Sequence, residues 1–393
     1  MRKIGIVVQR YGEDIVGGSE SYCRQIAERL AVSFEVEVLT SKSSDYMTWK
    51  NDIKRDFERL NGVLVRRFAS AQQRCLTDEL YQKAFKKDAS ASVGMDWVVA
   101  QGPYCPGLVD YVEQHGEEYD AFILMTYLYY PTVAVSKVVG HKSVLIPTAH
   151  DEPPIHQAVY SELFSNAAAW YYLTPEEKSF VEGMFNASGK VVGTGNGGVG
   201  VDVPRDVDEG VFREKYGLGD SPYIIYAGRI EEGKGCGVLF RYFAGWKLRH
   251  PGDDLKLVLV GAAKMPVLDH PDVLYLGFVD EVDKFSGIKG ALALVQPSRF
   301  ESLSIVLLEA LRSGTPVLVN GACKVLKGHC LRSNAGLYYA NYLEFEKELE
   351  YMMTHPDVHG RMGELGVRYV DENYSWDVIM GELCSLIDRV AAR

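Results

Sequence analysis

The sequence has few cysteines and no excess of positive charge, and each shortage excludes a class of protein. Seven cysteines, an odd number scattered over 393 residues from Cys23 to Cys384, do not form the dense pattern of a disulfide framework. Acidic residues outnumber basic ones, 53 against 42. The resulting net charge of −11 argues against nucleic-acid binding and against broad adhesion to anionic membranes.

Long apolar runs are also missing. No uninterrupted run reaches the length of about 18 apolar residues that marks a membrane-spanning helix. The opening residues, MRKIGIVVQRYG, hold too few apolar residues for the apolar region of a signal peptide. We therefore expect a cytoplasmic protein with at most peripheral contact at the inner membrane face. A hydrophobic share of 47% suffices for well-packed cores, and the length predicts roughly two to three domains.

Strand-like runs alternate with helix-like ones along the chain. The strand-like runs of the first half are 4–8, 35–40, 63–68, 121–125 and 143–148. The alternation resumes at Tyr223, with helical patterns at 237–249 and 281–288. Strand followed by helix, repeated, predicts an α/β fold with parallel sheets. The glycine-rich stretch 195–208 favours neither element, and we interpret it as the linker between two domains.

The segment 297–321, PSRFESLSIVLLEALRSGTPVLVNG, places Glu301 and Glu309 eight residues apart. Apolar residues recur there at helical spacing, which predicts a helix over 303–313 ended by the Ser-Gly-Thr-Pro break. Glu301 would then lie in a loop at the carboxyl end of strand 291–296. Such strand ends are where α/β sheets bind ligands.

A second segment, YAGRIEEGKG, carries fixed positive charge. Arg229 and Lys234 follow strand 223–227 and precede a helix. A diphosphate needs cations and backbone N–H donors, and two cations beside a helix N-terminus supply both. The alternative is surface pairing of these cations with Glu231 and Glu232. A P-loop is disfavoured because a glycine replaces the Ser or Thr that would hold Mg²⁺ after the lysine.

The Glu-x7-Glu segment and the Gly-Arg-x4-Lys-Gly segment together resemble the signature of family 4 (group 1) retaining glycosyltransferases. The resemblance covers most of the chain, firmly in the second half and more loosely in the first. It implies the GT-B fold, an α/β architecture of two Rossmann-like domains whose parallel sheets face a central cleft. We expect an acceptor-side domain over 1–197, a nucleotide-sugar-binding domain over 198–375, and a last helix, 376–393, that packs back on the first domain.

The resemblance also implies roles for residues in both predicted domains. Glu301 would position the transferred sugar, Arg229 and Lys234 would bind the donor diphosphate and stabilise its charge as it leaves, and His150 would contact the donor sugar. Glu309 would accept hydrogen bonds from the ribose hydroxyls. The other expected donor-binding residues are Gly17, Gly18, Val279, Lys284, Leu303, Ser304 and Ile305.

Several of these positions have other interpretations. An ordinary strand-to-helix turn is the alternative for Gly17 and Gly18, which precede a helix that Ser19 is expected to cap. A structural histidine paired with Asp151 is the alternative for His150. The family commonly has Glu-Gly-Phe-Gly where this chain has Glu-Ser-Leu-Ser at 301–304, and this departure leaves the donor sugar open.

Metal ligands and cofactors are not expected. Asp206 and Asp208 match an Asp-x-Asp pattern but lie in the linker, so we interpret them as solvated acids. Cys323, His329 and Cys330 lack an evident fourth ligand, and we interpret them as reduced cysteines beside a structural histidine. The two cations of the YAGRIEEGKG segment would take the role that a metal ion has elsewhere.

The stretch 49–87 has more basic than acidic residues and is interleaved with aromatic ones. A solvated helical face is the favoured interpretation, and contact with a membrane or with a phosphorylated acceptor is the alternative.

We expect a metal-independent, hexosyltransferase-type enzyme. It would move a sugar from a nucleotide-sugar donor, a UDP- or GDP-sugar, to a glycan, lipid-linked or small-molecule acceptor with retention of configuration. A nucleotide-sugar isomerase or epimerase on the same fold and a catalytically silent nucleotide-sugar-binding protein are the alternatives. The sequence leaves the donor sugar, the base, the acceptor and the oligomeric state open.

Overall fold

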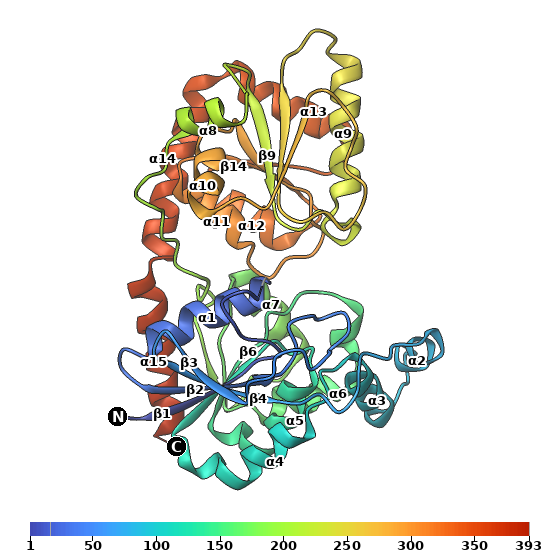
Figure 1. Cartoon of the computed structure of the whole chain (residues 1–393), viewed down its shortest axis with the longest axis vertical. Coiled ribbons are helices and arrows are strands. Elements are labelled where there is room, and N and C mark those ends of the chain that lie inside the picture. Colours follow the sequence, from blue (N-terminus) through green and yellow to red (C-terminus); the bar gives the residue numbers. More distant parts are fainter. Residues whose placement is uncertain (16, 393) are drawn as a thin grey trace. The chain divides into compact units, whose positions relative to one another are not determined.

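The computed structural model describes residues 1–15 and 17–392, and the chain forms two compact α/β units. Unit 1 consists of Met1–Gly198 and Asp377–Arg393, and unit 2 of Val199–Trp376. Residue 16, in the predicted first domain, and residue 393, the last of the predicted C-terminal helix, lie outside the described residues. Each unit is built around its own sheet (Figure 1).

The sheet of unit 1 has eight strands in the order β3-β4-β2-β1-β5-β6-β7-β8, and only β3 and β4 pair antiparallel. The strands are β1 (Lys3–Val7), β2 (Glu35–Ser41), β3 (Phe57–Leu60), β4 (Val63–Phe68), β5 (Ala121–Met125), β6 (Ser143–Ile146), β7 (Ala169–Trp170) and β8 (Val191–Val192). Strand β5, AFILM, is buried along its whole length, as a strand covered on both faces must be. The parallel arrangement brings the loops after β1, β2, β4, β5 and β6 to one edge of the sheet.

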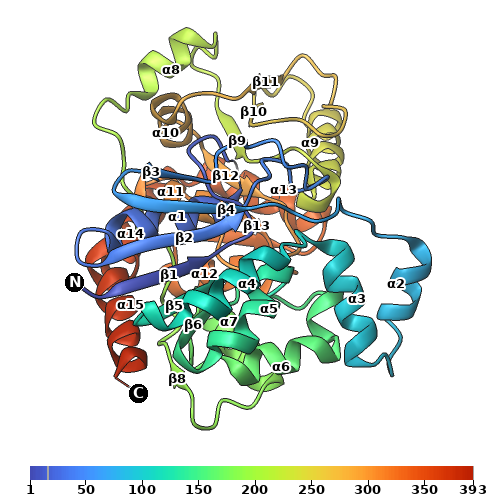
Figure 2. The same cartoon turned by 60° about the horizontal axis from the view of Figure 1, so that its bottom comes forward.

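The helices of unit 1 are α1 (Gly18–Leu30), α2 (Asp78–Ala84), α3 (Ala91–Gln101), α4 (Pro106–His115), α5 (Tyr130–Val139), α6 (Ala158–Asn166), α7 (Pro175–Met184) and α15 (Trp376–Ala391), whose first residue belongs to unit 2. Short 3₁₀ turns cover Gly116–Glu118, Gly140–Lys142 and Pro153–His156. Apolar side chains of α3 to α6 pack with the sheet in one buried core. Figures 1 and 2 both show α2 and α3 at the margin of the unit, outside the sheet.

Unit 2 contains a six-stranded parallel sheet in the order β11-β10-β9-β12-β13-β14. Its strands are β9 (Tyr223–Ala227), β10 (Lys256–Val260), β11 (Val273–Gly277), β12 (Ala293–Gln296), β13 (Val317–Asn320) and β14 (Gly336–Tyr339). Its helices are α8 (Glu209–Lys215), the 3₁₀ turn η4 (Glu232–Lys234), α9 (Cys236–Arg249), α10 (Glu281–Lys289), α11 (Ile305–Arg312), α12 (Lys324–Ser333), α13 (Tyr342–Thr354) and α14 (Pro356–Asn373). Apolar and aromatic side chains of α9 and α13 pack with those of the strands in one buried core.

The stretch interpreted as a linker, 195–208, contains no helix or strand, and α8 begins directly after it. Asp206 and Asp208 are both exposed, and the Asp208 carboxylate also caps α8 by accepting hydrogen bonds from the N–H groups of Gly210 and Val211. Among the described residues, no helix combines the length and the apolar composition that crossing a membrane requires.

Candidate functional site

The loop between β12 and α11 carries the first glutamate of the Glu-x7-Glu segment, and it ends on an unusual backbone conformation. Ser304, the residue before α11, has φ of 66°, in the left-handed region that glycine prefers. This conformation costs a non-glycine residue about 1 kcal/mol. The amide of Gln296 donates to the Ser304 hydroxyl at 3.3 Å and holds the side chain inside. Strain of this kind often marks ligand-binding loops.

Glu301 is joined to the loop that follows β9. The ammonium of Lys234 donates to Glu301 Oε1 at 2.7 Å, and the two side chains are 29% and 12% exposed. Strands β9 and β12 are neighbours in the sheet, so their loops emerge side by side at the carboxyl edge. Residues from the two segments that the sequence singled out therefore meet in one half-buried ion pair.

A glycine allows these two loops to approach each other. Gly235 has φ of 76°, and a Cβ atom there would lie 2.5 Å from the carbonyl oxygen of Pro297. The Ser298 hydroxyl also donates to the carbonyl of Lys234 at 3.4 Å. No other residue type fits at position 235 without moving the β12 loop.

Glu309, the second glutamate, lies on α11 and pairs with a lysine of α10. Lys284 Nζ lies 2.9 Å from Glu309 Oε1 and 2.9 Å from Glu281 Oε2. Burial raises the pKa of the Glu309 carboxyl, although the charge of Lys284 opposes this shift. The sequence predicted Lys284 only as a donor-binding residue; in the structure it contacts the second glutamate of the motif directly.

Arg229 matches one part of the surface-pairing alternative, and Lys234 does not. The guanidinium of Arg229 lies 3.4 Å from Glu231, as that alternative expects, and its side chain is 35% exposed. Lys234 instead pairs with Glu301 across the loops. Both cations lie near the N-terminal end of α9, which begins at Cys236.

Two further positions expected to bind the donor lie where α11 begins, and a third precedes α10. Leu303 is buried, and Ile305, the first helical residue, is half-buried. The N–H group of Ile305 lies in the first turn of α11, where N–H groups have no hydrogen-bond partner within the helix. Val279 lies between β11 and Asp280, the N-cap of α10, and is half-buried.

His329, from the CKVLKGHC segment, is buried and supports the loop between β12 and α11. Its Nε2 lies 3.1 Å from the carbonyl oxygen of Leu303, and its Nδ1 lies 3.0 Å from the Tyr369 hydroxyl. Burial lowers the pKa of His329 to about 3, so the ring is neutral. The described residues contain no cluster of three or more His, Cys, Asp or Glu side chains that could hold a metal ion.

In unit 1, Gly17 and Gly18 begin α1, and the predicted Ser19 cap is wrong. The N-cap is Gly17, while the Ser19 hydroxyl donates to Glu20 at 2.9 Å. A Cβ atom at Gly17 would lie 2.2 Å from the Glu20 carboxylate, which forms a buried ion pair with Arg10 at 2.6 Å. Gly17 thus makes room for an Arg10–Glu20 pair that the sequence analysis missed.

His150 follows β6, and its partner differs from the one expected. Glu152, not Asp151, lies 3.4 Å from His150 Nε2, and Asp151 pairs with His156 instead. The Tyr127 hydroxyl donates to Glu152 at 2.6 Å. Burial raises the pKa of Glu152, but hydrogen bonds from these two partners outweigh it and leave the pKa lowered.

A further buried carboxyl group, Glu177, holds the same loop in place. It accepts hydrogen bonds from the N–H group of Ala149, the residue before His150, at 2.5 Å and from that of Leu173 at 2.7 Å. Its burial raises its pKa to about 8. The sequence carried one signal of this residue, the Thr-x-x-Glu capping pattern at the start of α7.

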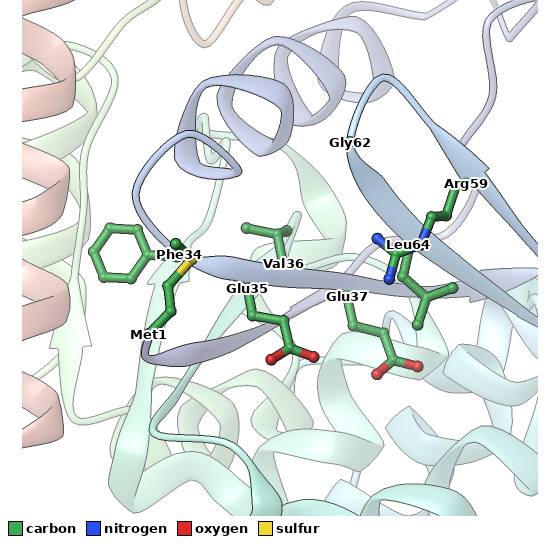
Figure 3. A pocket seen from close by; sticks show the side chains of 8 residues that line it. All are labelled: Met1, Phe34, Glu35, Val36, Glu37, Arg59, Gly62 and Leu64. Carbon is green, nitrogen blue, oxygen red and sulfur yellow. The ribbon is translucent and has the colours of Figure 1, made fainter.

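A surface cavity in unit 1 lies away from all these residues. It is lined by Met1, Phe34, Glu35, Val36, Glu37, Arg59, Gly62 and Leu64 (Figure 3). These residues surround the amino ends of β2 and β4, opposite the carboxyl edge where α/β sheets bind ligands. The cavity contains none of the predicted site residues.

Comparisons with known proteins address unit 2 most directly. Residues 221–352 match the family described as Glycosyl transferases group 1. Alpha-D-kanosaminyltransferase from Streptomyces kanamyceticus is 27% identical over 199 residues, which cover 47% of this chain and 50% of that protein. The chain spans about half the length of the first curated relatives it matches, 50% and 42%.

Many solved structures resemble the whole chain, among them a sucrose-phosphate synthase and the protein HepE. Sucrose-phosphate synthase from Thermosynechococcus elongatus has a TM-score of 0.73 at 16% identity, with 100% of both chains covered. Anabaena HepE, in complex with UDP and glucose, has a TM-score of 0.71 at 15% identity, with 99% of this chain and 100% of that one covered. These likenesses show that the chain has the GT-B fold, which the sequence predicted.

Proposed function

We propose that this chain, which has the GT-B fold and whose residues 221–352 match the group 1 glycosyltransferases, is a retaining glycosyltransferase of family 4. It would transfer a hexose from a nucleoside diphosphate sugar to a glycan, lipid-linked or small-molecule acceptor. A uridine nucleotide is the first donor to test, because HepE was solved with UDP and glucose.

The observation that carries this proposal is the pair of lysine–glutamate contacts in unit 2. Lys234 holds Glu301, and Lys284 holds Glu309, each at less than 3 Å. Two carboxylates alone would repel a diphosphate, but lysines beside both of them make the region compatible with an anionic ligand. The carboxylates remain available to accept hydrogen bonds from sugar and ribose hydroxyls.

In the proposed mechanism, the binding groups take separate roles. Glu309 accepts hydrogen bonds from the ribose, and Glu301 from the transferred sugar. Lys234 shifts some of its hydrogen bonding from Glu301 to the diphosphate. Together with Arg229 it stabilises the negative charge that develops on the leaving diphosphate. Backbone N–H groups at the start of α11 add donors for the same anion.

The proposed transfer breaks the bond from the anomeric carbon to the diphosphate oxygen and forms a bond from the same face to the acceptor oxygen. The acceptor's proton passes to the departing diphosphate, so no side-chain nucleophile is needed. The two cations would take the role of a metal ion, and we propose that the reaction is metal-independent.

Thermal-shift binding in the presence of EDTA tests the proposal first. UDP, GDP, ADP and TDP are compared, and the diphosphate that binds should raise the Tm by mass action. The matching sugar donors are then supplied with acceptors, and NMR of the product should show the donor's anomeric configuration retained. The proposal is contradicted if no nucleoside diphosphate binds, or if the product has the inverted configuration.

A further inference from the structure

Four segments of unit 1 meet beyond the carboxyl edge of its sheet. They are 42–53 after β2, 69–77 after β4, 101–105 from the last residue of α3 onward, and 126–130 from β5 to the first residue of α5. Backbone N–H groups of Arg74 and Cys75 donate to the carbonyls of Thr48 and Ala100, and the Trp49 indole donates to the carbonyl of Gln101 at 2.6 Å. The side chains of these segments are therefore held in fixed positions next to one another.

Arg74 supplies a cation at this meeting point. Its guanidinium donates to the carbonyl oxygen of Tyr46 at 3.3 Å and to the side-chain oxygen of Gln101 at 2.6 Å. Both partners are neutral, and within the described part of the chain no carboxylate lies within ion-pair distance of this half-buried side chain. A guanidinium has five N–H donors, so several remain for a further acceptor.

The carboxylates of the neighbouring loops have other donors. Asp45 accepts from the N–H of Met47 and the hydroxyl of Thr48, and Asp52 accepts from the N–H and hydroxyl of Ser44. Glu20 belongs to Arg10. The positive charge of Arg74 is therefore not neutralised by the acids of the loops around it.

Four tyrosines lie on the same segments as this cation. Tyr46, Tyr104, Tyr129 and Tyr130 are all half-buried and lie on the same four segments. The rings of Tyr104 and Tyr130 meet edge to face at 4.8 Å, and Tyr129 meets Trp49 in the same way at 5.6 Å. Partly exposed tyrosines offer apolar faces and hydroxyl groups, a combination that suits a sugar ring.

We propose that Arg74 and these tyrosines form the acceptor subsite, and that the acceptor is a small sugar carrying one anionic group, a phosphate or a carboxylate. The planar guanidinium matches the paired oxygens of either group, and the rings take the sugar. This assignment rests on the proposed glycosyl transfer, since it names the substrate that receives the sugar. It also gives a specific role to Arg74, one basic residue of the stretch 49–87.

Calorimetric titration of the full chain tests the subsite directly. The probes are hexose 6-phosphates, hexose 1-phosphates, an inositol phosphate and hexuronic acids, each against its uncharged parent sugar, with and without a nucleoside diphosphate. We expect an anionic probe to bind at least about tenfold more tightly than its parent, as losing a charge-assisted hydrogen bond implies. The phosphate and carboxylate probes show which anion is used.

Arg74→Gln should remove most of that preference, and Arg74→Lys should restore part of it. Arg59→Gln is the matched control, because Arg59 is an exposed arginine of β3 that lines the cavity of Figure 3. The proposal is overturned if no anionic probe outbinds its parent. It is equally overturned if Arg74→Gln weakens charged and neutral probes alike, which would make Arg74 only a clamp between loops.

The same measurements distinguish failure of the acceptor subsite from failure of the proposed glycosyltransferase function. Arg74→Gln should leave the thermal shift produced by nucleoside diphosphates unchanged, since that binding is assigned to unit 2. Anion-dependent sugar binding without any diphosphate binding would retain the subsite and reject the transferase. Diphosphate binding and transfer to neutral sugars alone would retain the transferase and reject the subsite.

Discussion

Arg229 is the residue whose removal should most clearly lower the rate in the proposed mechanism. Arg229→Ala should cost about 3 kcal/mol of transition-state stabilisation, comparable with the loss of one oxyanion donor, and lower kcat on the order of a hundredfold. Steady-state kinetics with the donor identified by binding measure this. Glu231→Ala removes the arginine's carboxylate partner but leaves the cation, so its kcat should change far less. A near-normal kcat in Arg229→Ala would remove Arg229 from the mechanism.

Glu309 is expected to act in binding rather than in chemistry. Glu309→Ala should weaken nucleoside diphosphate binding by about tenfold, because a charged acceptor for the ribose hydroxyls is lost and Lys284 loses a partner. Calorimetry gives the dissociation constants. Glu364→Ala, on the exposed surface of α14, is the control and should bind like the wild type. Equal affinities for the two variants would argue against the ribose contact.

Glu177 should make stability depend on pH in a particular direction. Because burial raises its pKa to about 8 in the folded state, the protein keeps a proton that the unfolded chain loses near pH 4.5. Its contribution to stability is therefore complete below pH 4.5 and is lost as the pH rises to about 8.

The change that tests this is Glu177→Gln, with Tm measured between pH 5 and pH 9. The Tm of the wild type relative to the variant should fall as the pH rises, because the variant has no proton to lose. A relative Tm that rises over this range would mean that Glu177 is ionised in the folded protein, held so by the N–H groups of Ala149 and Leu173.

At the scale of elements, the contact between the loops after β9 and β12 depends on one backbone position. Gly235→Ala combines a left-handed φ with a close contact to Pro297, so we expect a loss of about 1–3 kcal/mol in unfolding free energy and a lower Tm. Gly233→Ala is the matched control, since a Cβ atom there meets open space, and its effect should stay within about 0.5 kcal/mol. Equal losses would show that the contact does not constrain the loops.

Local periodicity predicted some elements well and others not at all. The apolar spacing of LSIVLLEALRS predicted the helix that forms α11, with ends differing by one or two residues. Helix α14 went unpredicted, because three glycines within PDVHGRMGELGVRYV lower helix propensity. In the structure, a Cβ atom at Gly363 would lie 2.4 Å from the carbonyl of Gly314, and one at Gly366 would lie 3.1 Å from that of Leu311. These glycines permit close packing on the segment of α11, and no local pattern shows that.

At the scale of the whole molecule, helix α15 near the end of the sequence belongs to unit 1, and this assignment leads to a prediction about stability. Helix α15 buries Ile379, Leu383, Leu386, Ile387 and Val390 within the described structure. Tyr171 donates to the carbonyl of Ile379 at 3.2 Å, and Glu382 accepts the N–H of Thr194. Side chains between 379 and 390 are thus part of the core of the first unit.

Leu383→Ala should therefore destabilise unit 1 by about 2–5 kcal/mol through the cavity it leaves. Hydrogen exchange should become faster in β5 and β6 of unit 1 and stay unchanged in β9 and β12 of unit 2. Val378→Ala, on the same helix but 45% exposed, is the control. Faster exchange confined to unit 2 would contradict this assignment of the helix.

The sequence by itself determined the α/β class, the fold resemblance and the two segments around Lys234 and Glu301. Those features rest on local chemistry, since apolar periodicity, glycine positions and motif spacing are properties of neighbouring residues. The tertiary structure alone decided the partners: Lys234 with Glu301, Lys284 with Glu309, and Arg74 among four loops. Each partnership joins residues at least 25 positions apart, and parallel strand order, which no local pattern contains, brings them to one edge of a sheet.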